Sequence, residues 1–115
     1  MKKKIAFIIN PKSGTASKEN IPDIISQELD KELYTHEVVF TEFRGHGSAL
    51  TVKFVSEQYD VVVAVGGDGT VNEVARELPH TDVSLGIIPI GSGHRLARHL
   101  GIPMNVRKAV QQLNH

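Results

Sequence analysis

A run of five apolar residues, VVVAV at 61–65, leads directly into GGDGT at 66–70 and then into a helical pattern. No polar residue alternates with the valines, which is typical of a parallel β-strand that helices cover on both faces. A strand followed by a glycine-rich turn and a helix is part of a βαβ unit. This stretch therefore predicts a layered α/β fold.

The rest of the chain continues this alternation of strands and helices. Strands are predicted at residues 4–10, 34–41 and 84–90, and EFRGHGS at 42–48 is predicted to be a loop. Because parallel strands need helical crossovers, the pattern predicts a three-layer Rossmann-like α/β domain with a mainly parallel sheet. A short helix is expected at 95–100. The other helices are marked by Ile21, Ile24, Ile25 and Leu29; by Ala49, Val52, Val55 and Tyr59; by Val71, Val74, Ala75 and Leu78; and by Val106, Ala109, Val110 and Leu113.

Two of these helices carry start signals. Asn20 is available as a cap for the first helix, with Pro22 in its first turn. Thr70 and Glu73 fit a capping box at the start of the third helix. Since Thr70 then occupies the capping position, we favour a ligand-site role for Asp68 over a capping role.

The composition is that of one globular domain of 115 residues, with 40% hydrophobic and 23% charged residues. The formal net charge of zero argues against nucleic-acid binding through a basic surface. The absence of cysteine excludes disulfides and thiolate sites and is compatible with a reducing cytosol. No apolar run approaches the roughly 18 residues of a membrane span, so we expect any lipid contact to be peripheral.

Four glycine-containing loops follow the predicted strands: NPKSG at 10–14, FRGHG at 43–47, GGDGT at 66–70 and GSG at 91–93. Ligands of such sheets bind beyond the carboxyl ends of the strands, so this edge is the candidate site. Backbone N–H groups and the helix dipole at a strand–glycine–helix junction favour phosphate. GGDGT is neither the Walker pattern nor the GxGxxG fingerprint.

Asp68 is unexpected in such a loop because a carboxylate repels bare phosphate. It would be useful as a Mg²⁺ ligand, directly or through water, or as an acceptor for a hydroxyl that attacks phosphorus. In the first loop, Lys12 would neutralise phosphate charge, while Ser13 and the N–H of Gly14 would hydrogen-bond it. These residues indicate phosphoryl transfer.

Four motifs occur in a fixed order: NPKSG, a threonine closing the second strand with GHG soon after it, GGDGTVNEV, and GIIPIGSGHRLARHLGIP. In order and spacing they resemble the N-terminal domain of the diacylglycerol kinase and sphingosine kinase-like lipid kinases. The resemblance spans nearly the whole chain. NAD kinases are more distant relatives that share the GGDG element, but the PIGSG turn and the ARHLGIP tail resemble the lipid kinases.

The resemblance implies ATP-dependent transfer of a γ-phosphoryl group, with Mg²⁺, to a lipid hydroxyl such as that of diacylglycerol. It also implies a cytoplasmic protein with peripheral contact at the inner membrane face. Asp68 would act close to the transferred group. The implied nucleotide contacts are Asn10, Pro11, Lys12, Ser13, Gly14, Thr41, Gly66, Gly67, Asp68, Gly69, Thr70, Val71, Asn72 and Ser92.

Two features depart from the family's pattern. His94-Arg95 stands where members usually carry asparagine, and Arg95 adds bulk and charge beside the nucleotide. Relatives continue into a β-rich second domain that shapes the lipid site, whereas this chain ends in its last helix. We therefore expect residues 1–115 to be the nucleotide-binding half, with weak nucleotide binding and little or no turnover alone. Homodimer formation through the exposed cleft surface stays open.

Two other functions stay open, an NAD kinase-like enzyme and a non-catalytic nucleotide-binding regulatory module. The six histidines show no metal-binding spacing, so no dedicated metal site is predicted. His46, in GHG, lies at the expected site edge and is a candidate positioning residue. The basic residues His94, Arg95, Arg98 and His99 are interpreted as a solvated helix face rather than a phosphate-attracting or membrane-attracting patch.

Overall fold

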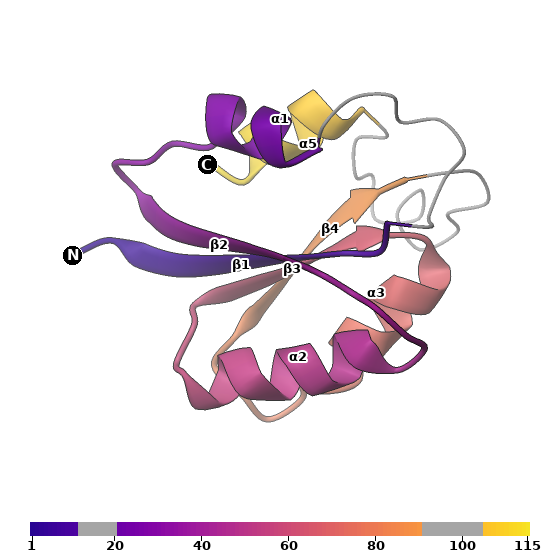
Figure 1. Cartoon of the computed structure of the whole chain (residues 1–115). Helices are drawn as coiled ribbons and strands as arrows, with labels where there is room; N and C mark the ends of the chain where they lie inside the picture. The colour runs from indigo at the N-terminus through magenta and orange to yellow at the C-terminus, as the bar shows by residue number, and fades with distance from the viewer. Residues whose placement is uncertain (12–20, 91–104) are drawn as a thin grey trace.

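A sheet of four parallel strands forms the centre of the structure (Figure 1). The computed structural model describes residues 1–11, 21–90 and 105–115. The strands lie in the order β2-β1-β3-β4, and each of their bounds is within one residue of the prediction. They are β1 (Lys3–Ile9), β2 (Tyr34–Phe40), β3 (Val61–Gly66) and β4 (Ser84–Pro89).

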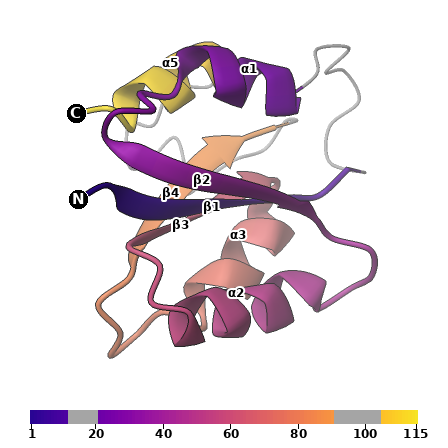
Figure 2. The same ribbon diagram turned by 60° about the vertical axis from the view of Figure 1, so that its left-hand side comes forward.

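Helices cover both faces of this sheet (Figures 1 and 2). One face carries α1 (Ile21–Glu28) and α5 (Val106–Gln112), and the other carries α2 (His46–Ser56) and α3 (Asp68–Ala75). The predicted three-layer α/β fold with a parallel sheet is confirmed.

Strand β1 belongs to both apolar cores because its side chains alternate between the two faces. Phe7 joins the cluster formed with α1 and α5, whereas Ile8 joins the cluster formed with α2 and α3. All residues from Ile5 to Ile9 are at most 2% exposed. Burial on both faces fixes β1 at the centre of the sheet.

Helix α2 differs from the prediction in both its start and its buried face. The predicted loop at 42–48 is wrong in its second half, because the helix begins at His46. The predicted apolar stripe is half right: Val55 and Tyr59 pack against the core, but Ala49 and Val52 are exposed. The buried residues of the helix are Gly47, Thr51 and Phe54. Thr51 is accommodated in the buried face because its Oγ1 donates to the carbonyl of Gly47 at 2.7 Å.

Helix α3 begins before the predicted capping box. Asp68 is its first residue, and the extended Gly67 (φ −90°, ψ −171°) is the N-cap. Thr70 lies inside the first turn, where its Oγ1 accepts from Asn10 Nδ2 at 3.3 Å. The Glu73 carboxylate accepts hydrogen bonds from backbone N–H groups at the start of α2 and not from its own helix. The predicted capping box is therefore wrong, because tertiary partners take both side chains.

The predicted core face of α3 is confirmed at Val71, Val74 and Leu78, which are buried, whereas Ala75 is only partly buried. Helix α3 ends at Ala75, so Leu78 lies beyond it. Three other predictions lie outside the described residues: the cap at Asn20, the GSG loop at 91–93 and the helix at 95–100 with its basic side chains.

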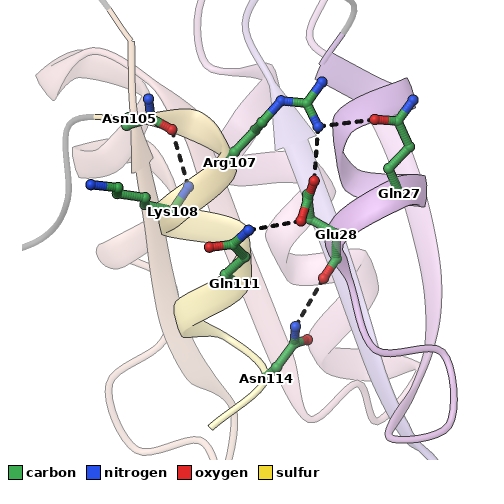
Figure 3. Close-up of polar contacts among 7 residues, drawn as sticks. All are labelled: Gln27, Glu28, Asn105, Arg107, Lys108, Gln111 and Asn114. Carbon is green, nitrogen blue, oxygen red and sulfur yellow. Dashed lines mark hydrogen bonds and ion pairs between the residues drawn. The ribbon is translucent and has the colours of Figure 1, made fainter.

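A polar cluster centred on Glu28 joins α5 to α1 (Figure 3). Arg107 Nη1 donates to Glu28 Oε2, and Gln111 Nε2 donates to Glu28 Oε1, each at 2.8 Å. The hydrogen bond from Gln111, and to a smaller extent that from Arg107, holds the pKa of Glu28 below its usual value of 4.5. Asn114 bridges the end of α1: its Nδ2 donates to the Glu28 carbonyl at 2.9 Å, and its Oδ1 accepts from Asp30 N at 2.8 Å.

We expect Asn114→Ala to lower the free energy of unfolding by about 1–2 kcal/mol, because two hydrogen bonds at the end of α1 are lost. Urea denaturation measures this change. Gln112→Ala is the matched control, since this neighbouring side chain is exposed. Equal stability of Asn114→Ala and the native chain would contradict the assigned role of Asn114.

Candidate functional site

The carboxyl ends of the four strands meet at one edge of the sheet (Figure 1), as the sequence predicts. Backbone hydrogen bonds continue the ladders past the strand ends and hold the first loop residues in register. These bonds run from Asn10 N to Val65 O (3.0 Å), from Thr41 N to Ile9 O (2.8 Å) and from Ile90 N to Gly66 O (3.1 Å).

A hollow of about 390 Å³ opens at this edge. Five predicted site residues line it: Asn10, Pro11, Thr41, Gly69 and Thr70. Four further lining residues were not named as contacts from the sequence: Glu42, Phe43, Arg44 and Glu73. Phe43 and Arg44 belong to the FRGHG loop, which was predicted to lie at this edge.

The start of α3 forms one wall of this hollow. Asp68 is half-buried in the first turn, with a buried Oδ1, and it does not itself line the hollow, whereas the next two residues, Gly69 and Thr70, do. A Cβ added at the exposed Gly69 would meet no atom within 4 Å, so packing inside the chain does not require glycine there. Close approach of a ligand to the backbone does give a reason for it.

Other predicted site residues are placed differently. Val71 is 2% exposed within the core, and its N–H donates to the Gly67 carbonyl at 3.1 Å, so it holds the first turn together. Asn72 is exposed and does not line the hollow. Gly66 is buried at the end of β3. The predicted contacts of Lys12, Ser13, Gly14 and Ser92 lie outside the described residues.

The loop between β2 and α2 forms the opposite wall. The Phe43 and His46 rings are stacked, with centroids 4.3 Å apart and planes at 12°. His46 Nδ1 accepts from Glu42 N at 2.9 Å, so the imidazole is held against the loop backbone. Gly45 permits this turn through its positive φ of 89°. His46 itself does not line the hollow, so its predicted positioning role stays a prediction.

Glu73 connects the two walls. Its Oε2 accepts from Gly45 N and its Oε1 from Gly47 N, both at 3.0 Å. This places a negative charge at the positive end of the α2 dipole. A Cβ at Gly47 would lie 2.8 Å from Glu73 Oε1, which explains the second glycine of GHG. No local pattern indicates this contact, because 26 residues separate Glu73 from Gly47.

Glu73→Gln should lower the free energy of unfolding by about 1–3 kcal/mol. The amide keeps one uncharged acceptor oxygen, so one of the two N–H groups at the start of α2 loses its acceptor and the other loses the negative charge of its acceptor. Chemical denaturation tests this, with the exposed Glu32→Gln as the matched control. Unchanged stability of Glu73→Gln would show that the carboxylate is dispensable for joining α3 to α2.

The described residues contain neither a membrane-spanning helix nor a cluster of metal-ligating side chains. Between residues 1–11, 21–90 and 105–115, no helix has the length and apolar character needed to cross a bilayer. The same part of the chain contains no group of three or more His, Asp or Glu side chains that could hold a metal ion.

Residues 4–115 match the family model described as the diacylglycerol kinase catalytic domain. The chain belongs to this family. The lipid kinase resemblance predicted from the four motifs is therefore confirmed. The parallel sheet is also that of the family's solved structures: the chain superposes on 42% of a diacylglycerol kinase crystal structure from Bacillus anthracis strain Sterne. That match covers 97% of this chain, with a TM-score of 0.78 and 26% identity.

Curated family members show how much of the relatives is matched. The chain is 35% identical to the diacylglycerol kinase of Staphylococcus saprophyticus over 114 residues, which are 96% of this chain and 37% of that protein. It is 36% identical to the diacylglycerol kinase of Staphylococcus aureus strain RF122, covering 96% of this chain and 36% of that protein. The chain thus spans little more than a third of the length of these relatives.

Proposed function

We propose that this chain provides the nucleotide-binding part of a lipid kinase, which transfers the γ-phosphoryl group of ATP to the hydroxyl of a lipid such as diacylglycerol. The observation that carries the proposal is the position of Asp68 in the first turn of α3, directly before Gly69 and Thr70, which line the hollow at the sheet edge. The family match favours a lipid acceptor over the NAD kinase-like and regulatory alternatives.

The phosphates would lie against the start of α3. Its first-turn N–H groups and dipole favour negative charge, and Gly69 leaves room for close approach. Asn10 and Thr70, joined by a hydrogen bond, line the same hollow and would present polar atoms to the phosphates. Arg44, on the opposite wall, would add positive charge.

Asp68 fits a Mg²⁺ ion that accompanies the nucleotide. Magnesium usually keeps several waters and uses one or two carboxylates together with substrate phosphates, so a single carboxylate beside the phosphate site is a suitable ligand. The bound ion would neutralise charge on the phosphates.

In the transfer step, the lipid hydroxyl oxygen would form a bond to the γ-phosphorus while the bond to the β,γ-bridging oxygen breaks, and ADP would leave. The Asp68 carboxylate would accept the hydroxyl proton or hold the ion. The walls of the hollow would supply positioning, which is the main protein contribution in phosphoryl transfer. We also propose that the protein is cytoplasmic and makes peripheral contact with the membrane that contains the lipid.

Calorimetric titration tests the nucleotide assignment. The chain should bind ATP in the presence of Mg²⁺, and Asp68→Ala should weaken this binding about tenfold because a ligand of the ion is lost. With EDTA in place of Mg²⁺, the same substitution should strengthen ATP binding, because the repulsion between carboxylate and phosphate is removed.

Asp82→Ala is the matched control, since this exposed aspartate precedes β4 and thus lies at the opposite edge of the sheet. It should leave both affinities unchanged. The nucleotide assignment would be wrong if the native chain bound ATP neither with nor without Mg²⁺.

A further inference from the structure

The most exposed aromatic side chain of the described loops lies at the rim of the hollow. Phe43 is 64% exposed, although burying a phenylalanine is normally favourable. One face of its ring is covered by the His46 imidazole, and the side chain lines the same hollow as Gly69 and Thr70. An aromatic ring in this position is a binding surface for a flat, apolar group.

This ring is held in place by its surroundings. His46 N donates to the Phe43 carbonyl at 3.1 Å, and His46 Nδ1 accepts from Glu42 N at 2.9 Å. Glu73 fixes the backbone of Gly45 next to this pair. A ligand that stacks on Phe43 therefore does not have to order the loop first, which reduces the entropic cost of binding.

We propose that the Phe43–His46 stack is the platform on which the base of the bound nucleotide lies, so that Phe43 determines affinity for the nucleoside part of the ligand and not for its phosphates. This inference rests on the proposed nucleotide function. The start of α3 and the β2–α2 loop are opposite walls of one hollow. If the phosphates lie against α3, the base of the same nucleotide extends toward the β2–α2 loop. Stacking of a base on an aromatic side chain changes affinity by about 5- to 150-fold, enough to govern binding.

The test compares ATP with inorganic tripolyphosphate, which has the phosphates but no base. Phe43→Ala should weaken ATP binding about tenfold and leave tripolyphosphate binding unchanged, whereas Phe43→Tyr should retain native affinity for both. Calorimetry measures both affinities for the native chain and for each of the two variants. The platform is disproved if Phe43→Ala weakens ATP and tripolyphosphate binding equally, or if it leaves ATP binding unchanged.

A fluorescence experiment gives an independent readout. The chain has no tryptophan, so Phe43→Trp introduces a single reporter at the platform. ATP should quench its emission and tripolyphosphate should not, because only the base can stack on the indole. Phe40→Trp is the matched control, since Phe40 is 46% exposed at the end of β2 but does not line the hollow.

The outcomes separate this inference from the proposed function. If the native chain binds neither ATP nor tripolyphosphate, the proposed function is wrong and the platform is wrong with it. If the native chain binds ATP and the Phe43→Trp emission does not respond to it, the nucleotide function stands and the platform is disproved.

Discussion

The remaining structure depends on the parallel pairing of β1 with β3, which aligns Ile5 with Val61 and Ile9 with Val65. Residues 5–9 and 62–65 are at most 2% exposed, so helices must cover both faces of this pair. Parallel neighbours require a crossover between successive strands, and all carboxyl ends then lie at the same edge. The position of the candidate site thus follows from the burial of apolar side chains.

Two helix starts near this edge have different electrostatic partners. At α2, the N–H groups of Gly45 and Gly47 donate to the Glu73 carboxylate within the chain. At α3, the first turn lies beside the hollow, with Asp68 as its own acidic residue. An internal carboxylate thus satisfies the first helix start, and the proposed phosphate site lies at the second.

The strands and the position of the site were predictable because they depend on local signals. Apolar runs define strand bounds to within one residue, and glycine loops after parallel strands must share an edge. The buried face of α2 was not predictable, because Thr51 satisfies its hydroxyl within the helix and Phe54 packs against Tyr59. The side chains of Glu42, Phe43 and Arg44 line the hollow, but their residue types alone do not indicate this position.

The sequence alone determined the layered α/β fold, the membership of a lipid kinase family and the position of Asp68 at the end of a buried strand, because each depends on short contiguous patterns. Only the tertiary structure decided that Thr70 and Glu73 act across the domain and not as a local cap. A capping box and a tertiary acceptor use the same side-chain atoms, and the choice between them depends on which N–H groups the fold brings within about 3 Å. Those N–H groups belong to α2, whose approach to α3 is fixed by packing on the sheet.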